Sequence, residues 1–267
     1  MYFFSIKMFK IWISIVGTFL FLSCGEQKKV KVSTRDSVPL ATKDTIIRVT
    51  PIEHATTVLT WNGYTIYVDP VGGKSAFKGH QNPDLILITD IHADHFDLGT
   101  LDSLDTKKAK IIVPQAVADR MPEQYTPQLD VLYNGERKSR FGITIEAVPM
   151  YNLREEALKF HPKGRGNGYL LTLGGQRIYF SGDTEDILEM RTLAHINKAF
   201  ICMNLPYTMT VESAADGVLA FAPKEVYPYH YRGRPTVSEV EKFKELVEMA
   251  NPNIKVIQLD WYPNEPY

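Results

Sequence analysis

The chain has 267 residues, of which 44% are hydrophobic and 23% are charged, and its formal net charge is −1. This balance is typical of a globular protein and gives no basic surface for nucleic acid, so we expect no nucleic-acid partner. The two cysteines are Cys24 and Cys202, and lipid modification of Cys24 would exclude a disulfide within the mature chain.

Residues 1–24 have the pattern of an export signal. Lys7 and Lys10 precede residues 11–22, an uncharged apolar stretch that is short for a membrane-spanning helix but fits the core of a secretion signal. The segment ends in Leu22-Ser23-Cys24-Gly25, which resembles a bacterial lipobox, in which the cysteine becomes the lipid-bearing first residue after cleavage. We therefore expect an exported protein that is anchored through Cys24 to a bacterial membrane and faces the periplasm or the cell surface. An uncleaved membrane anchor is the alternative interpretation.

The rest of the chain divides into a short tether and one domain. Residues 25–44 are polar and mixed in charge, which is typical of a solvated linker between a membrane and a folded part. Residues 45–267 contain no linker-like break, and a length of this order predicts a single domain.

Short β-type runs are densest in the first half of this domain. Two pairs of runs are joined by Asn62-Gly63 and by Gly174-Gly175, which are turn signals typical of two-residue β-hairpins. The predicted strands are residues 46–49, 57–60, 64–68, 85–89, 111–113, 143–148, 168–173, 177–180 and 255–259.

Helical periodicity is found in residues 186–196, 211–221 and 236–250. In the last of these segments, Thr236 and Glu239 have the spacing of a capping box. Because the strands come in two groups, each followed by helices, we expect an α/β domain of stacked sheets with helices outside.

Chemistry-bearing residues gather directly after the apolar run 85–89. Asp90, His92, Asp94 and His95 occupy four of six consecutive positions, and such a crowd of carboxylates and imidazoles suits a divalent cation better than a packed core. A solvated loop that is rich in acid and histidine is the alternative.

Two other apolar runs also end in residues of this kind. The run 177–180 leads into Asp183, and the run 226–229 leads into His230. An isolated aspartate after a glycine is usually a turn residue, and a lone histidine is more often structural. Side chains just past neighbouring strand ends nevertheless meet at a common rim, so the recurrence of the pattern favours a shared metal site.

These residues resemble the metallo-β-lactamase superfamily, and in particular the branch that includes L-ascorbate-6-phosphate lactonase and N-acyl-phosphatidylethanolamine phospholipase D. The motifs that carry the resemblance are His92-Ala93-Asp94-His95, Gly182-Asp183-Thr184 and Pro228-Tyr229-His230, supported by Glu53-His54-Ala55, Val68-Asp69-Pro70, Pro149-Met150-Tyr151-Asn152 and His161-Pro162-Lys163-Gly164. The resemblance implies a four-layer αββα sandwich with metals at one edge of the two sheets.

The resemblance also implies how the ligands are shared. Asp94, His95 and His230 would form one metal site, and Asp183 would bridge to a second site formed by His92, residue 90 and a histidine from the loop after residues 143–148. The chain departs from the family twice, because residue 90 is Asp90 where the family usually has histidine, and the later loop begins with Tyr151-Asn152, which leaves His161 as the nearest candidate. A loop histidine that bonds to the backbone is the alternative for His161.

The ligand set predicts a divalent metal, one ion or two, with zinc first and with manganese or iron tolerated because a carboxylate replaces an imidazole. The implied activity is that of a metal-dependent hydrolase, in which a metal-bound hydroxide attacks an ester-like bond of a lactone, a phosphodiester or an amide and Asp94 is the catalytic base. The alternatives are a metal-binding lipoprotein of the same fold without catalysis, and a phospholipase-type diesterase.

The substrate is predicted to be a small molecule that carries an anionic group. Lys163, Arg165 and Arg232 are candidate contacts for a phosphate or a carboxylate, and His54 is a candidate for the pocket wall. Solvated surface charge is the alternative for the cations, and a core or turn role is the alternative for His54. We interpret Cys202, which lies in an apolar run, as a small buried hydrophobe, and His80 and His195 as structural.

Overall fold

The computed structural model describes residues 46–263. The predicted signal peptide, the tether and Cys24 lie outside these residues. Within them, no helix has the length and apolar character that a membrane crossing requires.

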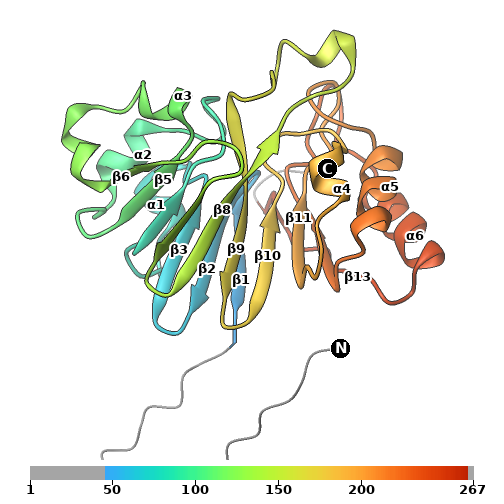
Figure 1. The fold of residues 1–267 in the computed structure, drawn as a ribbon, viewed down its shortest axis with the longest axis horizontal. Helices are drawn as coiled ribbons and strands as arrows, with labels where there is room; N and C mark the ends of the chain where they lie inside the picture. The colour runs from blue at the N-terminus through green and yellow to red at the C-terminus, as the bar shows by residue number, and fades with distance from the viewer. Residues whose placement is uncertain (1–45, 264–267) are drawn as a thin grey trace, which may run out of the picture. The chain divides into compact units, whose positions relative to one another are not determined.

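Two mixed sheets form the centre of the domain (Figure 1). The first sheet has six strands in the order β1-β2-β3-β4-β5-β6. Its strands are β1 (Arg48–Glu53), β2 (Thr56–Trp61), β3 (Tyr64–Val68), β4 (Leu85–Leu87), β5 (Lys110–Val113) and β6 (Leu129–Val131). The pairs from β3 to β6 are parallel, whereas β1, β2 and β3 pair antiparallel.

The second sheet has seven strands in the order β13-β12-β11-β10-β9-β8-β7. Its strands are β7 (Arg137–Arg140), β8 (Ile143–Met150), β9 (Gly166–Leu173), β10 (Gln176–Phe180), β11 (Lys198–Ile201), β12 (Glu225–Pro228) and β13 (Lys255–Val256). The strands from β10 to β13 are parallel.

Helices cover the outer faces of both sheets (Figure 1). On the first sheet these are α1 (Gly73–Ala76), α2 (Leu98–Ser103) and α3 (Gln115–Ala118), and on the second α4 (Leu188–Arg191), α5 (Val211–Phe221) and α6 (Val240–Ala250). Short 3-10 turns lie at Glu123–Gln128 and Glu155–Ala157. This arrangement confirms the predicted four-layer αββα sandwich.

The alternation of side chains along β4 explains why the layers form. Leu85 and Leu87 point into the core between the two sheets, whereas Ile86 and Ile88 belong to the core beneath α1–α3. A strand that is buried on both faces reads as a continuous apolar run, which is typical of parallel sheets. The polar residues that follow Ile88 are therefore displaced to the edge of the sheet.

Both predicted hairpin turns are confirmed. Asn62 and Gly63 join β2 to β3 with φ values of 51° and 82°, and Gly174 and Gly175 join β9 to β10 with φ values of 56° and 77°. Positive φ at both central positions matches the right-handed twist of the flanking strands and favours asparagine and glycine.

The helix predictions are confirmed in part. Residues 211–221 form α5 as predicted. The helix expected over 186–196 is only the short α4, which ends at Arg191, and further along the chain His195 takes a left-handed φ of 57° before β11. The prediction of a capping box at Thr236 is wrong. Thr236 instead accepts a backbone hydrogen bond from Gly233, and α6 begins at Val240 without a side-chain cap. The last predicted strand shortens to β13.

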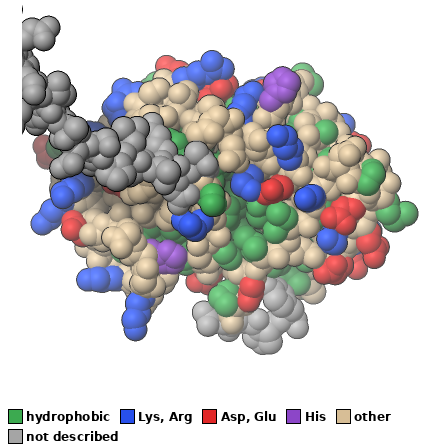
Figure 2. Space-filling model, turned by 90° about the horizontal axis from the view of Figure 1, so that it is seen from below, with side chains coloured by type: hydrophobic (Ala, Val, Ile, Leu, Met, Phe, Trp, Pro, Cys, Tyr) green, Lys and Arg blue, Asp and Glu red, His purple; other side chains and the backbone are tan. Residues whose placement is uncertain are grey.

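The surface agrees with the balanced charge of the sequence. On the described part of the face shown in Figure 2, lysine and arginine side chains are interspersed with aspartate and glutamate.

Candidate metal centre

Loops after the carboxyl ends of several strands meet at one edge of the sandwich. The loop after β4 carries Asp94 and His95, the turn after β10 carries Asp183, and the turn after β12 carries His230. Because β10 and β12 lie parallel on either side of β11, their carboxyl ends share an edge, and β4 contributes from the facing sheet.

His95, Asp183 and His230 form the buried centre of this edge. The Nε2 atoms of His95 and His230 are 3.1 Å apart. The Asp183 carboxylate lies beside both, with Oδ2 3.5 Å from Nε2 of His95 and Oδ1 3.3 Å from Nε2 of His230. These groups come from both sheets and converge on one point.

Asp94 completes this cluster on the solvent side. Its Oδ2 lies 3.4 Å from Nε2 of His230, its Oδ1 lies 3.9 Å from Nε2 of His95, and its side chain is 43% exposed. Asp94 is therefore the member of the cluster that a molecule arriving from solvent can touch.

His95 is held in place by a carboxylate beneath the cluster. Its Nδ1 donates to Oδ2 of Asp69 over 2.8 Å, and Asp69 also accepts from the backbone N–H and the hydroxyl of Thr89. With a proton fixed on Nδ1, the inward Nε2 of His95 keeps its lone pair for a cation.

A second group of ligand-type atoms adjoins the first through Asp183. His161 Nε2 lies 3.1 Å from Asp183 Oδ2 and 4.0 Å from Asp90 Oδ2, and Asp90 Oδ2 lies 2.9 Å from His92 Nδ1. The other ring nitrogen of His161, Nδ1, lies 3.1 Å from the Tyr207 carbonyl oxygen. His161 therefore has both the inward nitrogen of a ligand and the backbone contact of a loop histidine.

The charges of the cluster call for a cation. Burial alone lowers the pKa of His95, but Asp183, Asp69 and Asp94 raise it well above its usual value. Burial alone raises the pKa of Asp183, but His230, His95 and His161 hold it well below its usual value. Carboxylates that stay ionised while buried need positive charge beside them, which the histidines provide here and which a bound divalent ion would provide in their place.

The residues present fit a divalent metal. Oδ1 of Asp183 and Nε2 of His161 are buried and make ion-pair contacts, but among the described residues neither makes a well-oriented hydrogen bond. Ligand atoms of His95, Asp183 and His230 all lie within 4.8 Å of one another, as do those of Asp90, His92 and His161. Imidazole nitrogens and carboxylate oxygens are donors suited to zinc, manganese and iron.

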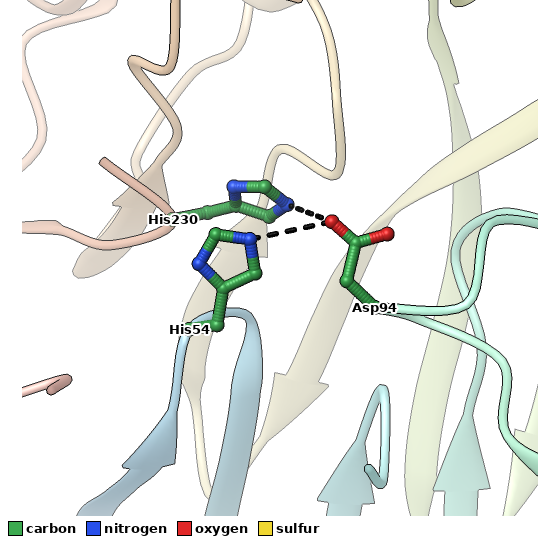
Figure 3. Close-up of side chains that lie close together, drawn as sticks. All are labelled: His54, Asp94 and His230. Atoms are coloured by element: carbon green, nitrogen blue, oxygen red, sulfur yellow. Dashed lines mark hydrogen bonds and ion pairs between the residues drawn. The ribbon is translucent and has the colours of Figure 1, made fainter. Parts of the chain in front are cut away.

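His54 extends the first cluster from the turn between β1 and β2. Figure 3 shows its ring and that of His230 on the same side of Asp94, and its Nε2 lies 3.3 Å from Asp94 Oδ2. Its Nδ1 lies 2.7 Å from the Tyr262 hydroxyl. Burial, followed by the neighbouring His230, lowers the pKa of His54 to about 4. A neutral His54 therefore acts on Asp94 through hydrogen bonding rather than as a cation.

Two cavities open onto Asp94 from different sides. One, of about 190 Å³, is lined by His92, Asp94, Phe160, His161, Asp183, Asn204 and Tyr207. The other, of about 270 Å³, is lined by Glu53, His54, Thr56, Val71, Asp94 and Arg232. Asp94 belongs to both walls, so both cavities reach the cluster.

The predicted substrate contacts occupy different environments. Lys163 is 62% exposed and pairs with Glu189 at 3.0 Å, away from both of these cavities. Arg165 pairs with Asp90, whereas Arg232 lines the second cavity and stacks over the Tyr262 ring at 4.4 Å. The three cations that the sequence suggests as substrate contacts thus lie in three different environments.

The residues interpreted as structural lie apart from the metal-type groups. Cys202 is buried with a free thiol, as predicted, and its Sγ contacts the Thr184 carbonyl oxygen at 3.3 Å. Neither His80 nor His195 belongs to a ligand-type group in the described chain, and His195 is exposed.

Sequence reasoning assigned no role to Asp69, Asn204 or Tyr207. Asp69 follows the apolar run of β3 just as Asp90 follows that of β4, so the same strand-end rule points to it. The Pro70 that comes next makes Asp69 look like an ordinary turn residue. Asn204 and Tyr207 reach the cavity wall through a loop after β11, and no local pattern marks them.

Comparison with known proteins decides the family. The model of the beta-lactamase superfamily domain matches residues 48–230, which is most of the described chain. The chain belongs to this superfamily. A UPF0173 metal-dependent hydrolase of Pyrococcus abyssi is 30% identical over 193 residues, which cover 68% of this chain and 84% of the relative.

Solved structures agree with this assignment. A protein of Parabacteroides distasonis described as a metal-dependent hydrolase is 35% identical, with a TM-score of 0.70 over 79% of this chain and 92% of that one. A metallo hydrolase of Ignicoccus hospitalis shares the fold at 22% identity, with a TM-score of 0.67 over 80% and 95% of the two chains. The protein is therefore a metal-dependent hydrolase of the beta-lactamase superfamily, and its His and Asp clusters are the groups that can hold the metal.

Proposed function

We propose that this hydrolase cleaves an ester-like bond of a small molecule, with the scissile bond held against Asp94. The observation that carries the proposal is that Asp94 lines both cavities. A substrate that fills the two cavities has its central bond beside this carboxylate and a substituent on either side. Cavities of this size take a small molecule rather than a polymer chain.

A divalent ion bound by Asp94, His95, Asp183 and His230 would polarise the substrate and lower the pKa of a water ligand from about 16 to about 7. We infer zinc as the resident ion, with manganese or iron tolerated, because the donors are imidazole and carboxylate. Asp69 holds His95 in the tautomer that leaves Nε2 free for this role.

In the proposed reaction, Asp94 is the general base. It accepts a proton from the attacking water and returns it to the leaving group. His54 and His230 contact its Oδ2 at 3.3 and 3.4 Å, so the carboxylate is held in one orientation while its exposed part faces the substrate. Holding a base within reach of the reacting bond removes the entropic cost of positioning it in the transition state.

We propose lactones, phosphodiesters and amides as the bond classes to test, in that order. The resemblance to lactonase and phospholipase D motifs supports the first two classes. Arg232 and Glu53 both line the second cavity, and the positive charge of Arg232 supports a substrate that carries an anionic group. If the anionic group belongs to a lipid, the proposed enzyme is a phospholipase-type diesterase.

The test is turnover by the metal-loaded protein on a lactone, bis(p-nitrophenyl) phosphate and an aryl amide, each with and without chelator. One class is expected to be hydrolysed in a chelator-sensitive manner, and Asp94→Asn is expected to lower kcat about 100- to 10,000-fold. Asp97→Asn is the matched control, since Asp97 caps α2 and accepts from the Thr100 hydroxyl, and lines neither cavity. Absence of turnover on every class, or normal turnover by Asp94→Asn, contradicts the proposal.

We also propose that the chain is a lipoprotein that is exported and anchored through Cys24. The apolar stretch 11–22 followed by Ser23-Cys24-Gly25 supports this. Labelled palmitate is expected to enter the wild-type protein, and Cys24→Ala is expected to lose both the label and the membrane fraction. Label in the Cys24→Ala variant, or membrane retention without label, rejects the anchor at this residue.

A further inference from the structure

The pair formed by Asp90 and Arg165 distinguishes the two groups of ligand-type atoms. Arg165 donates to both oxygens of Asp90, from Nε to Oδ1 over 3.1 Å and from Nη2 to Oδ2 over 2.8 Å. The Asp90 side chain is fully buried and that of Arg165 is 18% exposed. A bidentate pair of this kind is strong and fixed in orientation. Arg165 also donates to the Phe160 carbonyl, so its own position is tied to the neighbouring loop.

The same pair engages both ring nitrogens of His92. His92 Nδ1 lies 2.9 Å from Asp90 Oδ2, and His92 Nε2 lies 3.4 Å from Arg165 Nη2. With Nδ1 donating to the carboxylate, the lone pair of His92 lies on Nε2, which faces Nη2 of Arg165. The two hydrogens of that Nη2 are already directed to Asp90 and Phe160. An ion bound at Nε2 of His92 would therefore lie beside the guanidinium, and Asp90 Oδ2 already accepts two hydrogen bonds.

The distribution of charge also favours the first group over the second as a site for a divalent ion. Asp94 and Asp183 bring two carboxylates to the cluster of His95 and His230, without an arginine among the contacts described there. In the other group, the guanidinium of Arg165 cancels the negative charge of Asp90, and the neighbouring carboxylate, Asp183, is shared with the first group. A divalent ion placed beside Asp90 would lie close to this fixed positive charge, and like charges repel strongly where water is excluded.

We propose that this hydrolase binds one divalent ion tightly, through Asp94, His95, Asp183 and His230. Arg165 takes the place of a second cation beside Asp90. It thereby weakens the binding of a second ion by Asp90, His92 and His161. The proposal rests on the metal centre described above, but it concerns ion stoichiometry and not the substrate.

The test is a calorimetric titration of the metal-stripped full chain with Zn²⁺ in detergent, with metal content checked by mass spectrometry. The wild type is expected to bind one ion tightly and a second at least about tenfold more weakly. Arg165→Met is expected to strengthen the second binding step by about 10- to 100-fold and to leave the first unchanged. Arg165→Lys keeps the charge and is expected to stay near the wild type.

Arg140→Met is the matched control. Arg140 makes a bidentate pair with Asp130, from Nε at 2.7 Å and Nη2 at 2.6 Å, without a histidine beside it. Its loss is expected to leave both binding steps unchanged. Two equally tight ions in the wild type, or a weaker second step in Arg165→Met, would overturn the proposal, because Arg165 would then support the second ion rather than exclude it.

The double variant Asp90→His with Arg165→Met keeps the test decisive if Arg165→Met alone does not fold. It replaces the ion pair by a neutral imidazole and is expected to bind two ions tightly, with a normal circular-dichroism spectrum. A folded double variant that binds a single ion contradicts the proposal. Since substrate is absent from all these measurements, failure to find an ester-like substrate would leave this result unaffected.

Discussion

Asp69 and His95 form a fully buried pair in which Nδ1 of the imidazole donates to Oδ2 of the carboxylate over 2.8 Å. Oδ1 of Asp69 accepts from the backbone N–H of Thr89 over 2.7 Å, so both carboxylate oxygens face donors. The pair links the end of β3 to the loop after β4, and it aims Nε2 of His95 at Asp183 and His230.

Replacing Asp69 by asparagine is therefore expected to weaken metal binding about 10- to 100-fold, because outer partners of ligating histidines tune metal affinity by this amount. The amide has one acceptor oxygen where the native carboxylate offers two. Zinc affinity measured against a competing chelator is the readout. Asp84→Asn is the control, because Asp84 accepts from the Thr65 backbone N–H away from the cluster. Equal affinities in the wild type and Asp69→Asn would contradict this role.

Gly182→Ala is expected to lower stability and disturb the adjacent Asp183. Gly182 has a left-handed φ of 59°, and an added Cβ would lie 2.6 Å from Sδ of Met150. A left-handed alanine costs about 1–2 kcal/mol in unfolding free energy, and the contact adds to this. Gly63→Ala is the matched control, since Gly63 has a φ of 82° and no atom within 4 Å of the added Cβ.

Denaturant unfolding and zinc affinity of the two glycine variants distinguish the backbone strain of a left-handed alanine from the steric clash of its added Cβ. Gly63→Ala is expected to lose stability alone, whereas Gly182→Ala is expected to lose more stability and to bind zinc less tightly. The same loss in both variants, with zinc affinity retained, would mean that the space around Gly182 is unimportant.

His54 is expected to make the metal-free protein less stable as the pH falls. Its pKa is about 4 in the folded protein and 6.5 in an unperturbed chain. Between these values the unfolded state holds more protons, so protonation favours unfolding and stability drops as the pH decreases. The difference corresponds to at most about 3 kcal/mol in unfolding free energy.

The check on His54 is urea unfolding of the chelated wild type and of His54→Gln from pH 7 to pH 4. The glutamine variant lacks this titration, so the stability of the wild type relative to the variant should decline over the same range. A difference that does not change with pH would show that burial of His54 is not coupled to its proton.

The Cys202 thiol is expected to be unreactive in the folded protein. Burial raises its pKa to about 12, so the thiolate is scarce at neutral pH. Iodoacetamide at pH 8, followed by peptide mass spectrometry, should modify Cys202 only after denaturation. Rapid modification of Cys202 in folded protein would show that the region between β11 and α5 opens readily.

Much of the candidate site follows from local pattern. Asp90, His92, Asp94, His95, Asp183 and His230 each follow an apolar run, and the carboxyl ends of parallel strands gather such residues at one edge. The hairpin turns at Asn62 and Gly174 are local in the same sense, because their positive φ angles depend on the turn residues themselves. Asp69 follows the same rule as Asp90, but the Pro70 after it makes it resemble a turn residue. Its contact with His95 is therefore not predicted from the sequence.

Partner choice, in contrast, is decided by tertiary structure. Arg165 lies 75 residues from Asp90 in the chain, and its guanidinium reaches the carboxylate only because the loop before β9 runs beside the loop after β4. His161 meets Asp183 for the same reason, with Asn204 and Tyr207 brought to the cavity by a third loop. The local sequence determines which residues follow the end of a strand. The packing of the two sheets against each other determines which charged groups then lie in contact.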